Sequence, residues 1–142
     1  MSILNKCQNI FIDFDGVIVD SNKFKELAIE KSILKLIGKN QKSLDAINYF
    51  NKNAGISRFK KLSIFFEEKV VLEIMKIYSE ECNNFFKIAS PTVGLISFLE
   101  FIKIKNKSIK IYILSGGEKN EMQIFLKNNK LISFFEDILG SE

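Results

Sequence analysis

Two short apolar runs stand out along the chain, because each consists mainly of β-branched and aromatic residues. Residues 10–14 read IFIDF and residues 109–114 read IKIYIL, and each run is followed by small or acidic residues. Runs of this length and composition predict buried strands, and a third, shorter strand is expected at residues 134–139. In open α/β sheets ligands bind beyond the carboxyl ends of the strands, so chemistry is expected directly after the first two runs.

Between these runs the apolar residues recur at helical spacing. Gly38 is expected to stop the first helix, and Pro91 marks the end of the helical stretch, because proline cannot continue a helix. A serine can open a helix by accepting a hydrogen bond from a backbone N–H of the first turn. The expected opening serines are Ser21, Ser43 and Ser57, and further helices are expected at residues 70–86, 95–104 and 118–128.

The order of these elements predicts an α/β fold in two parts. Residues 1–20 and 90–142 are expected to form a core around a parallel sheet, and residues 21–89 a helical domain inserted after the first strand. A chain of 142 residues with 46% hydrophobic and 27% charged residues can bury a core without disulfides. Fourteen phenylalanines and no tryptophan predict a core rich in aromatic rings.

The net charge of +4 does not by itself indicate a nucleic-acid partner. Most of the positive charge comes from lysines spread along the chain, and Arg58 is the only arginine. Lysine is the poorer residue for bidentate recognition of phosphates and bases, so these lysines are interpreted as a solvated surface. No apolar run has the length of a membrane span or the form of a signal sequence, so we expect a cytoplasmic protein without a membrane partner.

The cysteines and the lack of histidine limit which side chains could bind a metal or transfer protons. Cys7 and Cys82 match no metal-ligand spacing, and the chain contains no histidine, the commonest metal ligand and proton shuttle. Acid–base chemistry is therefore expected from carboxylates or lysines.

Two carboxylates, Asp13 and Asp15, lie two residues apart at the end of the first strand. Carboxylates held this close repel each other, which favours a shared proton or a bound divalent cation, and Mg²⁺ accepts a site of one or two carboxylates completed by water and substrate phosphate. In this interpretation Asp13 attacks phosphorus to form an aspartyl-phosphate, and Asp15 protonates the leaving alcohol and then activates water. The alternative is a strand followed by an ordinary Asp-Gly turn.

A second candidate site follows the second strand. Ser115, Gly116 and Gly117 stand between that strand and the helix expected at residues 118–128. A hydroxyl and backbone N–H groups at the positive end of a helix favour an anion such as phosphate. The alternative is a serine that caps the helix in a flexible loop.

Together the two sites resemble a known family. The segment from Phe11 to Ser21, FIDFDGVIVDS, resembles the first motif of the haloacid dehalogenase superfamily, and residues 111–116, IYILSG, resemble its second motif. The stretch between them is similar to the helical cap of phosphoglycolate phosphatase and beta-phosphoglucomutase types. The resemblance implies a Rossmann-like parallel sheet with a helical cap, an aspartyl-phosphate intermediate, and Mg²⁺ held by the Asp13 side chain and the Asp15 main-chain carbonyl. Family dehalogenases lack the second acid, so Asp15 points to phosphate chemistry.

One further segment carries the resemblance into the cap. Residues 55–58, GISR, followed by Leu62, are similar to the segment with which beta-phosphoglucomutase types present an arginine to the distal phosphate of the substrate. Arg58 suits an anion site because its guanidinium is planar and bidentate. The alternative is an ordinary exposed helix residue.

The superfamily also uses a lysine in a third motif and an acid in a fourth. The chain reaches Glu142 without a matching pair, so we expect a product truncated before these motifs, with weak or no activity alone. Lys119 is the one lysine near the second site, and it is interpreted as a solvated helix residue. Without a further strand, residues 10–14 would form an apolar sheet edge, which favours self-association or pairing with a complementing chain.

Three interpretations stay open on the sequence. The first is a magnesium-dependent phosphate-monoester hydrolase acting on a small phosphorylated metabolite, and a phosphomutase of the same family is its close variant. The second, of another class, is a non-catalytic remnant that binds an anion or a partner chain through the sheet edge. The third is a receiver-like domain that a partner phosphorylates on aspartate, in which the helical insert would have no role. The enzyme hypotheses predict that Asp13→Asn abolishes phosphate release, and the remnant hypothesis predicts no change.

Overall fold

The computed structural model of the protein describes residues 7–141. The chain divides into two compact units, each described by itself below. The core unit contains the residues up to Ser21 and those from Phe86 onward, and the helical unit contains residues 22–85. The expectation that residues 21–89 act as a cap stays a prediction.

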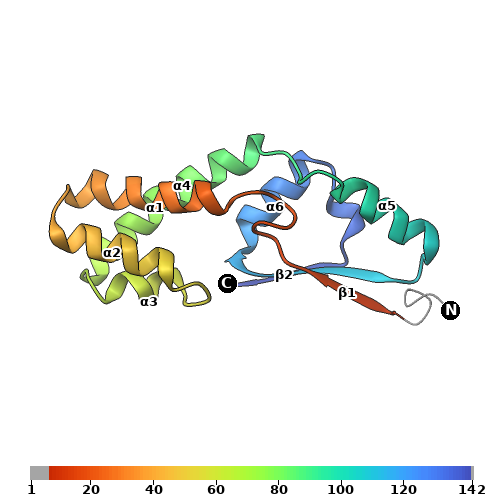
Figure 1. Ribbon diagram of the computed structural model, residues 1–142, viewed down its shortest axis with the longest axis horizontal. Coiled ribbons are helices and arrows are strands. Elements are labelled where there is room, and N and C mark those ends of the chain that lie inside the picture. The colour runs from red at the N-terminus through yellow and green to blue at the C-terminus, as the bar shows by residue number, and fades with distance from the viewer. Residues whose placement is uncertain (1–6, 142) are drawn as a thin grey trace. The chain divides into compact units, whose positions relative to one another are not determined.

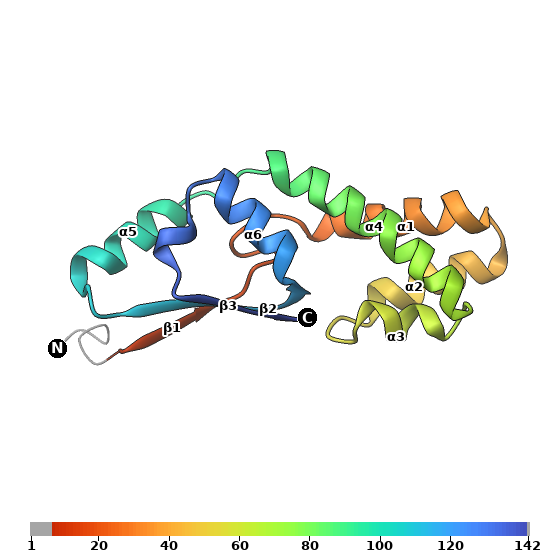
Figure 2. The same cartoon turned by 180° about the vertical axis from the view of Figure 1, so that it is seen from behind.

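The core unit is built around a parallel sheet of three strands in the order β1-β2-β3. Register is set by the pairs Ile12 with Ile113 and Ile113 with Ile138. Helices α5 and α6 lie on the same face of this sheet, as both ribbon views show (Figures 1 and 2). The elements in chain order are β1 (Asn9–Ile12), α5 (Leu95–Lys105), β2 (Lys110–Glu118), α6 (Lys119–Asn128), the 3-10 helix η2 (Ile132–Phe134) and β3 (Asp137–Ser141).

The covered face of the sheet carries the core. Isoleucines at alternate positions of the strands are buried there, because side chains alternate between the two faces of a strand. Phe14, Phe86 and Phe125 join them as a cluster of fully buried rings. The Phe14 ring centre lies 5.5 Å from each of the other two, edge-on to Phe125. The aromatic core expected from the composition is confirmed in this unit.

The opposite face of the sheet exposes apolar side chains. Phe11, Leu114 and Leu139 are 56%, 55% and 40% exposed, and the Phe11 ring stacks on Tyr112 at 5.3 Å. Among the described residues β1 also lies at an edge of the sheet, as expected. Parallel sheets are normally covered on both faces, so this face and this edge are available for a further contact.

The helical unit contains α1 (Asn22–Ile37), α2 (Gln41–Lys52), α3 (Arg58–Ser63) and most of α4 (Glu68–Ile88). Gly38 follows α1 with a φ of 78°, which confirms the predicted helix stop. Ser57 caps α3 by accepting a hydrogen bond from the Lys60 N–H at 3.4 Å, as predicted.

The predicted start of α2 at Ser43 is wrong by three residues. Asn40 is the capping residue, because its Oδ1 accepts a hydrogen bond from the Ser43 N–H at 3.0 Å. Ser43 Oγ in turn accepts one from the Asn40 N–H at 3.0 Å. Either a serine or an asparagine can cap a helix, so the local sequence offered two candidates and the reciprocal pair selected the earlier one.

Two strand boundaries also differ from the predictions. β1 ends at Ile12, not Phe14, because the chain turns sharply from residue 13 onward. β2 does not stop at Leu114 but continues through Ser115, Gly116 and Gly117 to Glu118. The cause is tertiary: Ser141 of β3 pairs with Glu118 after a register shift in the ladder.

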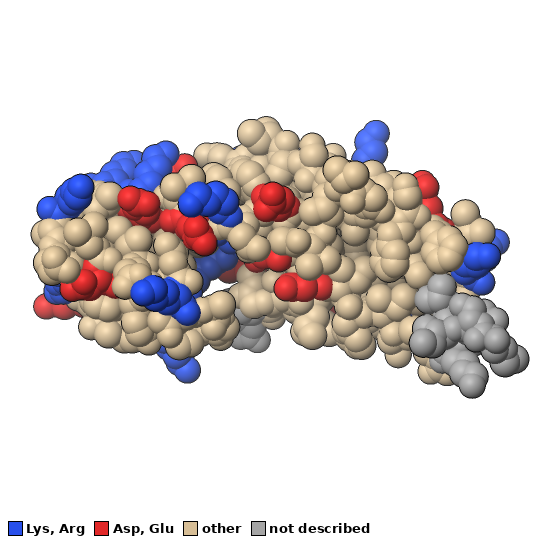
Figure 3. Space-filling model, in the orientation of Figure 1, with Lys and Arg blue, Asp and Glu red and all other residues tan. Residues whose placement is uncertain are grey.

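Charged side chains of both signs lie over the helical unit on the face in Figure 3. One of the ion pairs in this unit joins Lys31 Nζ and Glu81 Oε1 at 2.7 Å.

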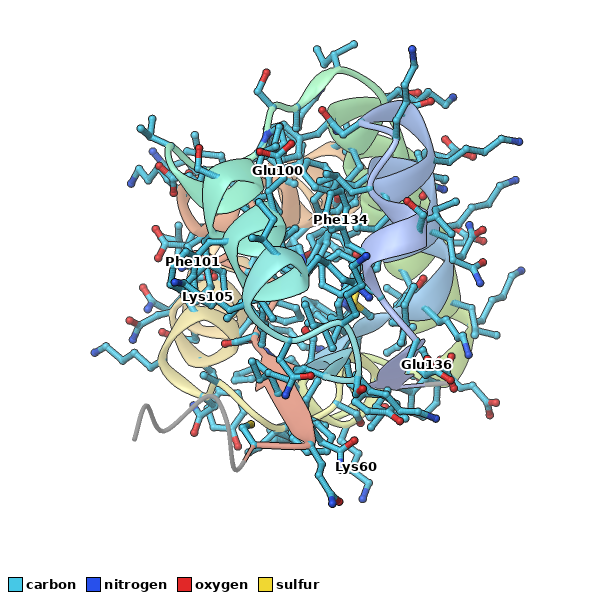
Figure 4. The ribbon with its side chains drawn as sticks, turned by 90° about the vertical axis from the view of Figure 1, so that its right-hand side faces the viewer. Lys60, Glu100, Phe101, Lys105, Phe134 and Glu136 are labelled. Atoms are coloured by element: carbon cyan, nitrogen blue, oxygen red, sulfur yellow. The ribbon has the colours of Figure 1, made fainter. Side chains whose placement is uncertain are left out.

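In the core unit, Lys105 lies over the ring of Phe101 on the outer side of α5, 5.6 Å from its centre (Figure 4). Within the described part of the chain, no helix combines the length and the hydropathy needed to cross a membrane.

Candidate active site

Asp13 stands directly after the carboxyl end of β1. It is exposed, while its neighbours Ile12 and Phe14 are buried in the core. Its Oδ1 accepts a hydrogen bond from the Phe14 N–H at 2.7 Å. Buried residues on both sides therefore anchor the backbone, and the carboxylate is held at the edge of the sheet.

A tight turn follows Asp13 and redirects the chain. The Phe14 carbonyl accepts hydrogen bonds from the N–H groups of Ile18 at 2.9 Å and Val19 at 3.2 Å. Gly16 has a φ of 80° and donates its N–H to the Val19 carbonyl at 2.7 Å. A residue with a Cβ is strained in this left-handed region, so the glycine of the motif is required by the turn.

Thr92 ties this turn to the segment that returns from the helical unit. Its N–H donates to the Ile18 carbonyl at 3.0 Å, and its hydroxyl donates to the Val17 carbonyl at 2.5 Å. Two segments far apart in the sequence are thereby joined through the backbone. These two bonds fix the later part of the turn.

Asp15 is half-buried and is held by Ser21. The Ser21 hydroxyl is fully buried and donates a hydrogen bond to Asp15 Oδ1. The sequence had suggested only a helix-capping role for Ser21; its place in the first motif was the available signal for a role beside Asp15.

Within the last part of β2, Ser115 Oγ accepts a hydrogen bond from the Gly117 N–H at 3.1 Å. Helix α6 begins at Lys119 with Glu118 as its capping residue, so the alternative of Ser115 as the helix cap is wrong. Gly140 of β3 lies close to this segment, because a Cβ there would stand 3.0 Å from the Gly117 carbonyl oxygen. The glycine allows β3 to approach and to continue the sheet.

One surface pocket connects the ends of β1 and β2. Its volume is about 640 Å³, and it is lined by Phe11, Ile12, Asp13, Leu114, Ser115 and Gly116. The parallel pairing of Ile12 with Ile113 explains why residues just beyond them meet. Three predicted site residues, Asp13, Ser115 and Gly116, are therefore brought together.

The other predicted site residues do not line this pocket. Asp15 lies two residues beyond Asp13 and faces Ser21. Arg58 belongs to the helical unit and stacks on Tyr78, with the guanidinium carbon 4.7 Å from the ring centre.

Lys119, the lysine nearest the second motif, is engaged elsewhere. Its Nζ lies 3.1 Å from Asp137 Oδ1. The Ile138 N–H and the Lys119 ammonium both hold the pKa of Asp137 below its usual range. Lys119 does not line the pocket, and the structure shows it as a surface partner of β3.

The described residues include no group of three or more His, Cys, Asp or Glu side chains that could hold a metal. The Asp13 carboxylate and the Asp15 main-chain carbonyl nevertheless offer oxygen donors of the kind that suit Mg²⁺. Mg²⁺ prefers hard oxygen ligands and is often bound through one or two carboxylates together with water and substrate phosphate. These two residues would hold it only in combination with such additional oxygens.

The family model of haloacid dehalogenase-like hydrolases matches residues 10–142. The chain belongs to this family. The match includes the turn after β1 and the pocket at the ends of β1 and β2, where the first two motifs of the family were expected. No curated protein sequence matches the chain at a significant level.

Solved structures of other family members share the fold. A haloacid dehalogenase-like hydrolase from Streptococcus pneumoniae is 22% identical with a TM-score of 0.67, and the match covers 97% of this chain and 63% of that one. A predicted phosphoglycolate phosphatase from Haemophilus somnus is 13% identical with a TM-score of 0.70, covering 95% and 63%. A proposed beta-phosphoglucomutase from Thermotoga maritima is 17% identical with a TM-score of 0.61, covering 94% and 61%.

Because all three sequence identities are below 25%, these structures show that the fold is shared and nothing beyond it. The chain spans less than two thirds of the length of each of these three structures. The structural neighbours within the family include both phosphatases and a phosphomutase by name.

Proposed function

We propose that the protein is a magnesium-dependent phosphate-monoester hydrolase of small phosphorylated metabolites that works through an aspartyl-phosphate intermediate. The observation that carries the proposal is the shared pocket of Asp13, Ser115 and Gly116 at the carboxyl ends of two parallel strands. A nucleophile and donors for an anion in one pocket are what a phosphoryl transfer requires.

Asp13 is the proposed nucleophile. Its carboxylate attacks the phosphorus of the substrate, the bond from phosphorus to the leaving oxygen breaks, and the phosphoryl group becomes attached to Asp13. Water then attacks the same phosphorus and releases phosphate and the free carboxylate. Covalent catalysis of this kind divides one difficult displacement into two easier ones.

Asp15 is the proposed general acid and base. In its protonated form it donates a proton to the leaving alcohol oxygen, and as a carboxylate it then accepts a proton from the attacking water. The hydrogen bond from the buried Ser21 hydroxyl supports this role because it orients the carboxyl group. Ser21 is thus a positioning residue in this proposal.

Ser115 and Gly116 are the proposed phosphate ligands. The Ser115 hydroxyl and nearby backbone N–H groups would donate to the phosphate oxygens on which negative charge develops. Asp13 and Asp15 would hold Mg²⁺ together with phosphate oxygens and water, and the bound ion would neutralise charge on the phosphoryl group. Arg58 is proposed to bind a distal phosphate of the substrate, as the likeness of residues 55–58 suggests.

The test is phosphate release from p-nitrophenyl phosphate and from a panel of phosphorylated metabolites, with and without added Mg²⁺. Asp13→Asn should abolish release, because an amide is a poor nucleophile, and should leave the circular dichroism spectrum unchanged. The matched control is Asp20→Asn, an exposed acid in the same segment that lines no part of the pocket. Equal release by the wild type and Asp13→Asn would refute the proposed role of Asp13.

A phosphomutase is the second candidate, favoured by the beta-phosphoglucomutase among the structural neighbours. A mutase would return the phosphoryl group to a second position of the substrate. Product analysis with a hexose monophosphate separates the two reactions, since a hydrolase yields free phosphate and a mutase yields an isomeric phosphate ester. A cytoplasmic location stays a prediction from the sequence.

A further inference from the structure

β1 presents a backbone edge on the side away from β2. The Gln8 carbonyl accepts a hydrogen bond from the Lys110 N–H at 2.9 Å, so the backbone groups of Gln8 point toward β2. Because successive residues of a strand turn these groups to opposite sides, the N–H and C=O groups of Asn9 and Phe11 point away from β2. Among the described residues, no strand pairs with that side of β1. Such an edge is a template for a further strand.

Helix α5 continues this edge as an apolar surface. α6 packs on β2 and β3, and α5 lies beside it on the β1 side of the same sheet face (Figure 4). Phe98 and Phe101 are 44% and 46% exposed, and residues three apart share one side of a helix. Figure 4 shows Phe101 on the side of α5 away from Phe134. The edge of β1 and the two rings of α5 therefore lie on the same side of the core unit.

We propose that this surface, defined by the β1 edge with Phe98 and Phe101, binds a second copy of the chain across a two-fold axis perpendicular to the sheet. The two β1 strands run antiparallel in this dimer, and the two sheets become one. The same axis places the two α5 helices side by side. With α5 over the space between β1 and β2, a strand spacing of about 4.8 Å puts the two helix axes about 10 Å apart, the separation of packed helices.

One register suits the residues of the edge. With Phe11 opposite Phe11 of the partner subunit, the two residues exchange a pair of backbone hydrogen bonds. Their rings, 56% exposed in one subunit, meet on the open face of the sheet. Asn9 then lies opposite Asp13 of the partner subunit, so an amide donor meets a carboxylate. A register with Asp13 opposite its own copy would bring like charges together, which is destabilising.

The size of the surface sets the expected affinity. Phe11, Phe98 and Phe101 are each about half exposed, and an aromatic side chain buries roughly 150–250 Å² in all, so the rings of both subunits bury about 600 Å². This area is about half of the roughly 1,200 Å² of the smaller specific interfaces, and the two β1 edges add to it. We expect a reversible dimer with a dissociation constant of about 1–100 µM. The inference concerns association alone and holds whether or not Asp13 reacts.

Sedimentation velocity of the full chain over about 1–200 µM tests the association. Phe101→Lys and Phe98→Lys should each raise the dissociation constant about tenfold or more, because a charge replaces a ring that the partner covers. Ile96→Lys is the matched control, since Ile96 is 45% exposed and stands five residues from Phe101, on the other flank of α5. It should leave the dissociation constant within about twofold, as expected for a surface substitution.

Amide hydrogen exchange of the same samples, read by NMR, tests the strand pairing. The Phe11 N–H should become protected as the concentration rises, whereas the Ile12 N–H, which points toward β2, should be protected throughout. The proposal is overturned if the chain stays monomeric over the whole range, which would leave the edge to a different chain or segment. It is also overturned if the chain dimerises while the Phe11 N–H stays unprotected, or if both α5 variants dimerise like the wild type, since the open sheet face would then be the interface.

Discussion

Replacing Lys61 by methionine should change how the stability of the protein depends on pH. Burial, and secondly the nearby Arg58 charge, lower the pKa of Lys61 from 10.5 to about 8. In the unfolded chain both causes vanish and the pKa returns to its ordinary value. Between pH 8 and 10.5 the unfolded chain therefore binds the proton that the folded chain has lost.

The sign and size of the effect follow from this difference. Stability rises with pH wherever the unfolded state binds more protons. One pKa unit corresponds to about 1.4 kcal/mol, so lowering the Lys61 pKa from 10.5 to about 8 amounts to roughly 3 kcal/mol. The free energy of unfolding of the wild type, relative to Lys61→Met, should thus increase by about 3 kcal/mol from pH 8 to pH 10.5. Below pH 8 the difference between the two proteins should be constant.

Urea unfolding followed by circular dichroism at several pH values between 7 and 10.5 measures this difference. Comparison with Lys61→Met cancels the titration of the other lysines and tyrosines, which the two proteins share. Lys60→Met should show the pH dependence of the wild type. If the wild type and Lys61→Met changed in parallel over the whole range, the reasoning from burial and charge would be refuted.

Three further predictions concern the core unit. Ser21→Ala should lower kcat of the phosphatase about tenfold, because one hydrogen bond to a charged group is lost. It should also shift the acidic limb of the pH–rate profile, and an unchanged profile would show that Ser21 is purely structural. Gly140→Ala should destabilise the fold by about 1–3 kcal/mol, because the added Cβ would stand 2.7 Å from Met122 Cε. Gly116→Ala should leave the stability unchanged, because the space around its Cβ is open. Thermal unfolding of the two variants measures the difference. Phe11→Lys should reduce self-association in sedimentation velocity, because Phe11 is 56% exposed on the open sheet face, while Ile64→Lys in the helical unit should leave it unchanged.

Several parts of the fold could be predicted because short-range signals determine them. The β-branched run before Asp13 forms a strand, and Gly38 ends α1, since only local backbone preferences are involved. That Asp13 and Ser115 lie close together followed from the parallel pairing that such runs favour. Their shared pocket confirms that expectation for these two residues.

Other features depended on contacts that the sequence does not display. β2 continues through two glycines because β3 pairs beside it, and Asn40 rather than Ser43 caps α2 because the two side chains bond reciprocally. The hydrogen bond from Ser21 to Asp15 requires the turn at Gly16 to bring the two together.

The order of strands and helices, the family, and the acidic and hydroxyl groups available for phosphate chemistry could all be recognised from the amino-acid sequence. Which of those groups meet in one pocket, and which lysine is buried, depends on how the helices and strands pack. Lys60 and Lys61 are identical residues side by side in the sequence, yet Lys60 is exposed, whereas Lys61 is buried with its amine over the ring of Phe50. Burial, and with it the pKa, is set by neighbours from other helices, and these are assembled only when the chain folds.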